Sequence, residues 1–155
     1  MYYSISCNGH LGPHGVTVSA AVLAPADKAV GADRPPRILI VEDDYFVAVD
    51  LEHCLQDAGF AVVGVAASAE EAFELAAAEK PVLALMDIRI AGARDGVETA
   101  IELQKSFGIP SIFATAHGDA ATRKRAEQAQ PLGWLQKPYS VTALIEAVRL
   151  ALATD

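Results

Sequence analysis

The stretch ILIVEDD, residues 38–44, decides the fold of this chain. Four apolar residues in succession are typical of a short strand that is buried on both faces. Three adjacent acids follow, and like charges side by side cost free energy unless they are solvated or surround a cation. The stretch therefore predicts a buried strand whose carboxyl end is either a solvated tip or a cation site.

Further short apolar runs follow this strand, and patterns with a helical period separate them. Each unit is a strand followed by a helix, which predicts a parallel sheet with right-handed crossovers. We therefore predict an α/β fold of the flavodoxin-like type, a (βα)5 doubly wound, five-stranded parallel sheet with helices on both faces. The predicted strands are RILIV (37–41), AVVGVAA (61–67), VLALMD (82–87), SIFAT (111–115) and GWLQ (133–136), and the predicted helices cover 47–58, 69–78, 96–107, 120–129 and 141–153.

Residues 1–36 differ from the rest of the chain, because they show no sustained hydrophobic period and end in the proline pair of DRPPR. Such composition is typical of disordered or loosely attached segments. We predict a leader over residues 1–36 and one domain over residues 37–155, which is long enough to bury a core.

The charge balance limits the classes of partner. Twelve Lys and Arg against twenty Asp and Glu give a net charge of −8. An acidic chain argues against nucleic acid or an anionic membrane surface as the main partner, and no apolar run approaches the length of a membrane span. Two cysteines, Cys7 and Cys54, are too few for a disulfide framework, so we expect a reducing compartment, the cytoplasm.

Polar side chains of different chemistry stand at the ends of four predicted strands. Glu42 and Asp43 follow the first strand, Asp87 ends the third, Thr115 ends the fourth, and Lys137 follows the fifth. The carboxyl ends of parallel strands form the functional crevice of such sheets. Carboxylates suit Mg²⁺ or Mn²⁺, and an ammonium and a hydroxyl can bind phosphoryl oxygens. This set predicts a phosphoryl-transfer site.

Asp87 is the expected nucleophile of this site. It is the first polar residue after an apolar run, so a rigid strand would hold it. Attack of a carboxylate on phosphorus forms an acyl phosphate, a known type of covalent intermediate. Taken alone, an Asp at a strand end is better explained as a cap of the following turn.

Four segments together resemble the receiver domain of two-component response regulators: ILIVEDD (38–44), LALMDIRIAGARDGVE (83–98), FATAH (113–117) and GWLQKPY (133–139). Their order and spacing match from about residue 37 to residue 153. The resemblance implies that Asp87 accepts a phosphoryl group from the phosphohistidine of a sensor histidine kinase or a phosphotransfer protein. Output would then proceed by protein–protein interaction or onward phosphorelay.

The resemblance also implies roles for individual residues near Asp87. Asp43, Asp87 and the backbone carbonyl of Arg89 would bind Mg²⁺, with Glu42 acting mainly through water. Asp44 remains a solvated bystander or a helix cap. Lys137, in a cis peptide with Pro138, would pair with the phosphate, and Thr115 would donate a hydrogen bond to it.

Further roles implied by the resemblance concern switching and lifetime. Movement of Thr115 would let an aromatic residue on the fifth strand turn inward. Trp134 stands at that position instead of the usual Tyr or Phe, and its larger ring leaves the size of the movement open. The alternative for Trp134 is a packed surface aromatic with no switching role. Arg89 and His117 would flank an attacking water and tune the lifetime of the acyl phosphate, unless they are ordinary loop residues.

Two enzyme classes and one binding module compete with this interpretation. A phosphatase with the same intermediate commonly has a second Asp two residues after the nucleophile, where this chain has Arg89. A P-loop enzyme would need a Gly-rich segment ending in Gly-Lys-Ser/Thr, which does not follow the first strand. A docking module that no longer accepts phosphate predicts the loss of an acid, the Thr or the Lys, and all are present. We expect no enzyme activity beyond the protein's own phosphorylation and dephosphorylation.

The output surface is the least specified feature of the sequence. Because no DNA-binding or enzymatic domain follows the last predicted helix, a single-domain regulator with an unidentified downstream protein partner is expected. Arg123, Lys124 and Arg125 form a basic run on the fourth predicted helix that could meet an acidic partner. Most charge runs are only solvated faces, so that alternative stays open.

Overall fold

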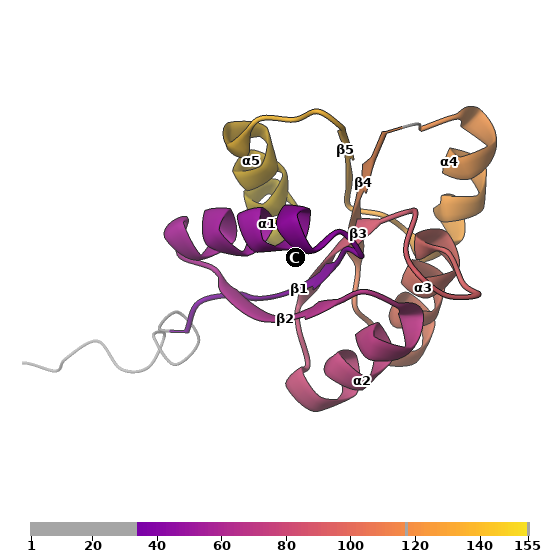
Figure 1. Ribbon diagram of the computed structural model, residues 1–155, viewed down its shortest axis with the longest axis horizontal. Helices are drawn as coiled ribbons and strands as arrows, with labels where there is room; N and C mark the ends of the chain where they lie inside the picture. The colour runs from indigo at the N-terminus through magenta and orange to yellow at the C-terminus, as the bar shows by residue number, and fades with distance from the viewer. Residues whose placement is uncertain (1–33, 117, 155) are drawn as a thin grey trace, which may run out of the picture. The chain divides into compact units, whose positions relative to one another are not determined.

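The computed structural model describes residues 34–116 and 118–154 (Figure 1). Most of the predicted leader and His117, which we expected to tune the acyl phosphate lifetime, lie outside the described residues. The described part begins just before the first strand, and the carbonyl of Pro36 accepts a hydrogen bond of 2.9 Å from the amide of Ala61.

Five strands and five helices alternate along the described chain. The strands form one parallel sheet in the order β2-β1-β3-β4-β5, which confirms the predicted flavodoxin-like fold. The elements are β1 Arg37–Val41, α1 Tyr45–Asp57, β2 Ala61–Ala66, α2 Ala69–Glu79, β3 Leu83–Asp87, α3 Gly96–Glu102, β4 Ser111–Thr115, α4 Ala120–Ala126, β5 Gly133–Gln136 and α5 Val141–Leu152.

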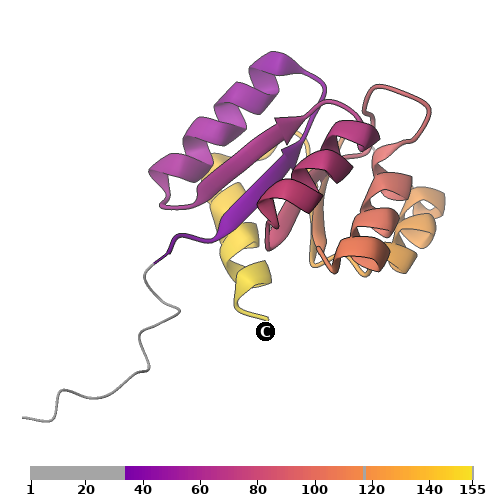
Figure 2. The same cartoon turned by 90° about the horizontal axis from the view of Figure 1, so that it is seen from below.

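Helices cover both faces of the sheet, α1 and α5 on one and α2, α3 and α4 on the other (Figures 1 and 2). Side chains of a strand alternate between the two faces. Within β1, Leu39 and Val41 therefore pack in the core with α2, α3 and α4, whereas Ile38 and Ile40 pack in the core with α1 and α5. The apolar residues of β1 thus contribute to two hydrophobic cores, one on each face of the sheet.

Ser and Asp residues that directly precede the helices cap their first turns. Ser140 caps α5 and Asp119 caps α4. Ser68 accepts a hydrogen bond from the amide of Glu71, as a capping box predicts, but the Glu71 carboxylate accepts from the amide of Ala67 instead of Ser68. The Glu71 side chain therefore reaches back four residues, to Ala67, where a capping box would have it reach back three.

The third helix differs from the continuous α-helix predicted over 96–107. It is α-helical to Glu102 and continues as a π-helical turn over Leu103–Phe107. Gly108 ends it with a φ of 66°, in the left-handed region that glycine adopts readily. An apolar pattern does not distinguish the two kinds of turn here, because a single π turn of five residues is too short to set a period of its own.

The strand order reverses between β1 and β3, which lie side by side at the centre of the sheet. Ligands of such sheets bind outside the carboxyl ends of the strands at this reversal. The residues that follow β1 and end β3 therefore occupy the expected functional edge. Among the described helices, none combines the length and the apolar character needed to cross a membrane.

Candidate functional site

Three carboxylates converge where β1 and β3 end. The two strands pair in parallel with Val41 opposite Met86, so the next residues, Glu42 and Asp87, fall side by side. Together with Asp43 they offer carboxylate oxygens that all lie within 4.8 Å of one another. The structure thus brings together the three acids that the sequence predicted as one site.

Lys137 reaches this cluster from the loop after β5. Its Nζ lies 3.2 Å from Oε2 of Glu42 and 3.4 Å from Oδ2 of Asp87. The Glu42 side chain is only 4 % exposed, and its other oxygen accepts a hydrogen bond of 3.1 Å from the amide of Asp44. The peptide between Lys137 and Pro138 is cis, as the resemblance implied.

The charges of this cluster influence one another. Burial is the largest cause that raises the pKa of Glu42, and the hydrogen bond from the Asp44 amide offsets it in part. Burial also opposes the charge on Lys137, but the nearby charges of Asp87 and Glu42 outweigh it and raise the pKa of Lys137. Lys137 is therefore cationic at neutral pH, and its ammonium faces the carboxyl groups of Glu42 and Asp87.

This donor set fits a divalent cation. All three side chains offer hard oxygen ligands, which Mg²⁺ and Mn²⁺ prefer. Carboxylates outnumber the one cation beside them, so a further positive charge would relieve their repulsion. The residues present are therefore compatible with the magnesium site that the sequence predicted.

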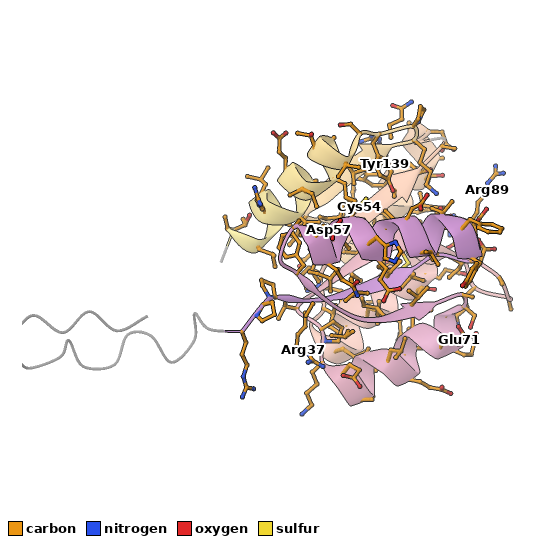
Figure 3. The ribbon with its side chains drawn as sticks, turned by 60° about the vertical axis from the view of Figure 1, so that its left-hand side comes forward. Arg37, Cys54, Asp57, Glu71, Arg89 and Tyr139 are labelled. Carbon is orange, nitrogen blue, oxygen red and sulfur yellow. The ribbon has the colours of Figure 1, made fainter. Side chains whose placement is uncertain are left out.

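The loop after β3 packs closely against Asp87. A Cβ atom added to Gly96 would lie 1.9 Å from the carbonyl oxygen of Asp87, so only glycine fits this approach. The amide of Gly96 donates a hydrogen bond of 2.7 Å to the carbonyl of Ile88, and the amide of Arg89 donates one of 3.3 Å to Oδ1 of Asp87. The backbone thus orients the expected nucleophile, while the Arg89 side chain projects outward (Figure 3).

A hollow of about 230 Å³ opens beside Asp87. Thr115 and Lys137, predicted as phosphoryl-binding groups, line it together with Arg89. Thr115 is buried, and its carbonyl accepts a hydrogen bond of 2.9 Å from the amide of Lys137. The hollow therefore gathers a carboxylate, a hydroxyl and an ammonium from three different strand ends.

The sequence did not predict the far wall of this hollow. Asp119 and Thr122, from the start of α4, line this side of the hollow, and neither was predicted as a site residue. Asp119 accepts a hydrogen bond of 2.7 Å from the amide of Thr122, which is the largest cause that lowers the pKa of Asp119. Asp119 preceding a helical pattern predicted only a cap, and nothing local indicated that the cap would border the site.

Trp134 lies in an aromatic and cationic stack. Its ring centre is 4.8 Å from that of Phe113 on β4, and the Arg123 guanidinium lies 4.6 Å from the Trp134 ring. Trp134 is partly buried and packs against the core that contains Phe113. Trp134, the residue expected to turn inward, thus contacts both Phe113 and Arg123.

The three basic residues on α4 are exposed, but they do not share the same contacts. Arg123 stacks on Trp134, and Arg125 forms an ion pair of 2.7 Å with Asp95, the residue that caps α3. Lys124 is exposed. Two of the three cations in the predicted partner face are therefore engaged within the protein.

Asp44 is a helix cap, one of the two roles expected for it. Its Oδ1 accepts hydrogen bonds from the amides of Phe46 and Val47, at 3.0 and 3.2 Å, and so satisfies the first turn of α1. Of the three adjacent acids, two belong to the carboxylate cluster and the third starts the next helix.

A second hollow, of about 320 Å³, lies between α1 and the start of α5. Cys54 and Tyr139 face it from these two sides (Figure 3), and its lining is mostly apolar except for Asp50 and Lys137. Lys137 borders both hollows. The amphipathic patterns of the two helices did not reveal this space, because it depends on how far apart they pack.

Comparisons with known proteins identify a family for this chain. The model of the response regulator receiver domain family matches residues 38–149. The transcriptional regulatory protein PdtaR of Mycobacterium tuberculosis is 37% identical over 128 residues, covering 83% of this chain and 60% of that protein. The phyllosphere-induced regulator PhyR of Methylorubrum extorquens is 36% identical over 122 residues, covering 77% of this chain and 46% of that protein.

Solved structures lead to the same family. The signal receiver domain of a modulated diguanylate cyclase from Desulfovibrio desulfuricans superposes with a TM-score of 0.72 at 39% identity, covering 77% of this chain and 94% of that one. A receiver-containing N-terminal domain from Carboxydothermus hydrogenoformans gives 0.69 at 34% identity, covering 76% and 94%. The chain spans three fifths or less of the two curated relatives named above, whereas it spans nearly all of these isolated domains.

Proposed function

This chain belongs to the family of response regulator receiver domains, and from this premise we propose that Asp87 is its phosphoacceptor. The donor would be the phosphohistidine of a sensor histidine kinase or of a phosphotransfer protein. One observation carries the proposal: Asp87 lies at the reversal of strand order, in a hollow that also contains the ammonium of Lys137 and the hydroxyl of Thr115.

The transfer follows from the positions of these groups. An oxygen of Asp87 attacks phosphorus, the bond from phosphorus to the donor imidazole nitrogen breaks, and the imidazole keeps the electron pair and takes up a proton. Lys137, held cationic beside Asp87, pairs with a phosphoryl oxygen of the product, and Thr115 donates a hydrogen bond to another. Breaking the contact between Lys137 and Asp87 frees the ammonium for this role.

Glu42, Asp43, Asp87 and the backbone carbonyl of Arg89 would hold Mg²⁺ or Mn²⁺ next to this hollow. When bound, the cation supplies positive charge that offsets the charge of the phosphoryl oxygens. Glu42 accepts hydrogen bonds from Lys137 and from the Asp44 amide, so we assign it an indirect role through water. Asp43 is exposed and its carboxylate is available from the solvent side.

Output would proceed by protein–protein interaction or by passing the phosphoryl group onward. Thr115 and Trp134 would carry the change from the hollow to the surface of α4, β5 and α5, where Arg123, Lys124 and Arg125 would meet a downstream protein. Arg89, exposed at the rim of the hollow, and His117 would set the lifetime of the acyl phosphate. We expect this exchange to take place in the cytoplasm.

Two alternatives make different predictions at the same site. A phosphatase would need an Asp as proton carrier two residues after the nucleophile, where the chain has Arg89, so we propose that turnover of external phosphate is absent. A docking module that acts without phosphorylation would keep the fold but form no acyl phosphate. The acids, the Thr and the Lys that this second alternative would be free to lose are all in place.

Intact-mass analysis tests the proposal. The protein is incubated with acetyl phosphate and Mg²⁺, with and without a chelator, and compared with Asp87→Asn, which keeps the shape of the side chain. A phosphoryl adduct that requires the cation and is absent from the variant supports the proposal. The same mass with and without acetyl phosphate under every condition would favour the docking module.

A further inference from the structure

Arg123 connects two parts of the protein that the proposed function uses, the loop after Thr115 and the ring of Trp134. Its guanidinium lies 4.6 Å from the centre of the Trp134 ring, and Trp134 in turn stacks on Phe113 of β4. A Cβ atom built on Gly118 would lie 3.3 Å from Nε of Arg123 and 3.6 Å from Cγ2 of Thr115. The Arg123 side chain therefore stacks on the ring and passes close to Gly118 in the loop.

The helix that carries Arg123 has little else to hold it. α4 is seven residues long, and Ala126 is its one buried residue, so burial of apolar surface contributes little to its position. Its ion pair between Arg125 and Asp95 is half exposed on the arginine side, and exposed pairs contribute little. A guanidinium stacked on a partly buried indole is a stronger contact than such a pair.

The first turn of α4 is also a wall of the phosphoacceptor hollow. Asp119 and Thr122 line that hollow together with Asp87 and Lys137, and the carboxylate of Asp119 accepts hydrogen bonds from both the amide and the hydroxyl of Thr122. A contact that fixes α4 therefore fixes this wall. Arg123 directly follows Thr122 in the chain.

We propose that Arg123 is a positioning residue of the phosphoacceptor site. By stacking on Trp134 it holds the first turn of α4 and the loop after Thr115 in the described arrangement. This inference rests on the proposed function, because it concerns how the hollow accommodates a phosphoryl group on Asp87. Such a group adds volume and charge against this wall, so the wall moves and the stack opposes the movement.

The test uses one substitution and a matched control. Arg123→Gln removes the guanidinium, and Lys105→Gln removes an exposed charge at the end of the third helix, where the lysine has no ion pair or ring contact within the described residues. Trp134 is the single Trp of the chain, so intrinsic tryptophan emission reports on it alone. Thermal denaturation confirms that each variant is folded.

Two readouts need no phosphodonor. In Arg123→Gln we expect faster amide hydrogen exchange across residues 118–122 and stronger quenching of Trp134 emission by acrylamide than in wild type, with Lys105→Gln unchanged. A third readout uses acetyl phosphate and Mg²⁺. Arg123→Gln should reach half-maximal adduct at an acetyl phosphate concentration lower by about 2- to 10-fold, the range expected for losing a contact of this kind.

Two further variants keep the test decisive. Arg123→Lys retains the charge but loses the planar stack, so it should lie between wild type and Arg123→Gln. Gly118→Ala places a methyl group against the guanidinium and should shift all three readouts in the same direction, by a smaller amount. It also serves as the test variant if Arg123→Gln does not fold.

The outcomes separate the inference from the function on which it rests. Equal exchange and equal quenching in Arg123→Gln and Lys105→Gln would overturn the role of Arg123, whether or not an adduct forms. If exchange and quenching change in Arg123→Gln but the acetyl phosphate dependence of adduct formation does not, the positioning role is also overturned, because the contact would then be structural only. If wild type forms no adduct, the proposed function fails, and the two donor-free readouts still decide whether Arg123 holds the wall.

Discussion

The ammonium of Lys137 donates a hydrogen bond of 3.2 Å to the carboxylate of Glu42, across 95 positions of sequence. This contact ties the loop after the last strand to the end of the first strand. Glu42 is buried and Lys137 is partly exposed. Lys137 thus neutralises the charge of the buried Glu42 carboxylate while its ammonium remains close to Asp87.

Replacing Lys137 with Met should destabilise the metal-free protein in a pH-dependent manner. A buried carboxylate left without its cation costs about 1–3 kcal/mol at neutral pH. Lys137 is one of the causes that lower the pKa of Glu42, so the variant raises that pKa further above its unfolded value. The folded state then binds the proton more tightly than the unfolded state, and stability falls as pH rises from the unfolded pKa of Glu42 through its higher folded pKa.

Urea denaturation at about pH 5 and about pH 7 measures this effect. The deficit of Lys137→Met relative to wild type should be larger at the higher pH. Arg125→Met serves as the control, because its ion pair with Asp95 is exposed and should contribute only a few tenths of a kcal/mol. Equal deficits at both pH values would show that Glu42 is not the group left uncompensated.

Mg²⁺ should stabilise the wild-type protein through the carboxylate cluster. A ligand that binds only the folded state adds about 0.4 kcal/mol at a concentration equal to its Kd and about 2.7 kcal/mol at 100 times that value. Thermal denaturation at increasing Mg²⁺ concentration should show the rise. Asp43→Asn, which removes an exposed member of the cluster, should abolish most of it. A variant stabilised as much as wild type would place the bound cation elsewhere.

Gly96→Ala should impair both the fold and the site. The added Cβ would lie 1.9 Å from the carbonyl oxygen of Asp87, and relief of such a contact requires backbone movement that costs about 1–3 kcal/mol or more. Adduct formation on Asp87 should slow as well. Gly133→Ala is the control, because its Cβ would meet only Ile112, at 3.7 Å. Denaturation and adduct kinetics that do not differ between the two variants would contradict this account of the loop.

Asp44 should act in stability and not in cation binding. Asp44→Ala removes the two hydrogen bonds to the first turn of α1 and should cost about 0.5–2 kcal/mol, whereas Asp44→Asn retains a capping oxygen and should cost much less. Urea denaturation measures both. The Mg²⁺-dependent rise in stability should be the same in both variants as in wild type. Loss of that rise in either variant would make Asp44 a member of the cation site.

Much of the fold could be predicted because its elements are short and clearly bounded. The predicted ranges of β1, β4 and β5 coincide with the observed ones, since prolines, glycines and charged residues border each apolar run. The acids after β1 and Asp87 at the end of β3 could be brought together in advance, because parallel strands align their carboxyl ends at one edge. The helix caps could be read from Ser and Asp before each helical period.

The remaining features depend on contacts between elements that no local pattern encodes. The stack of Arg123 on Trp134 joins two segments whose packing distance is a property of the folded core. The approach of Gly96 to Asp87 follows from the path of the loop between them. The wall of the hollow formed by Asp119 could not be predicted, because a capping Asp looks the same in sequence wherever its helix lies.

The most direct test of the central claim is the chemical position of the phosphoryl group. The protein is treated with acetyl phosphate and Mg²⁺, any acyl phosphate is reduced with borohydride, which converts a phosphorylated Asp to homoserine, and the peptides are mapped by mass spectrometry. The account predicts homoserine at position 87 and none when a chelator is present. Homoserine at another position, or unmodified Asp87 after full exposure to the donor, would contradict it.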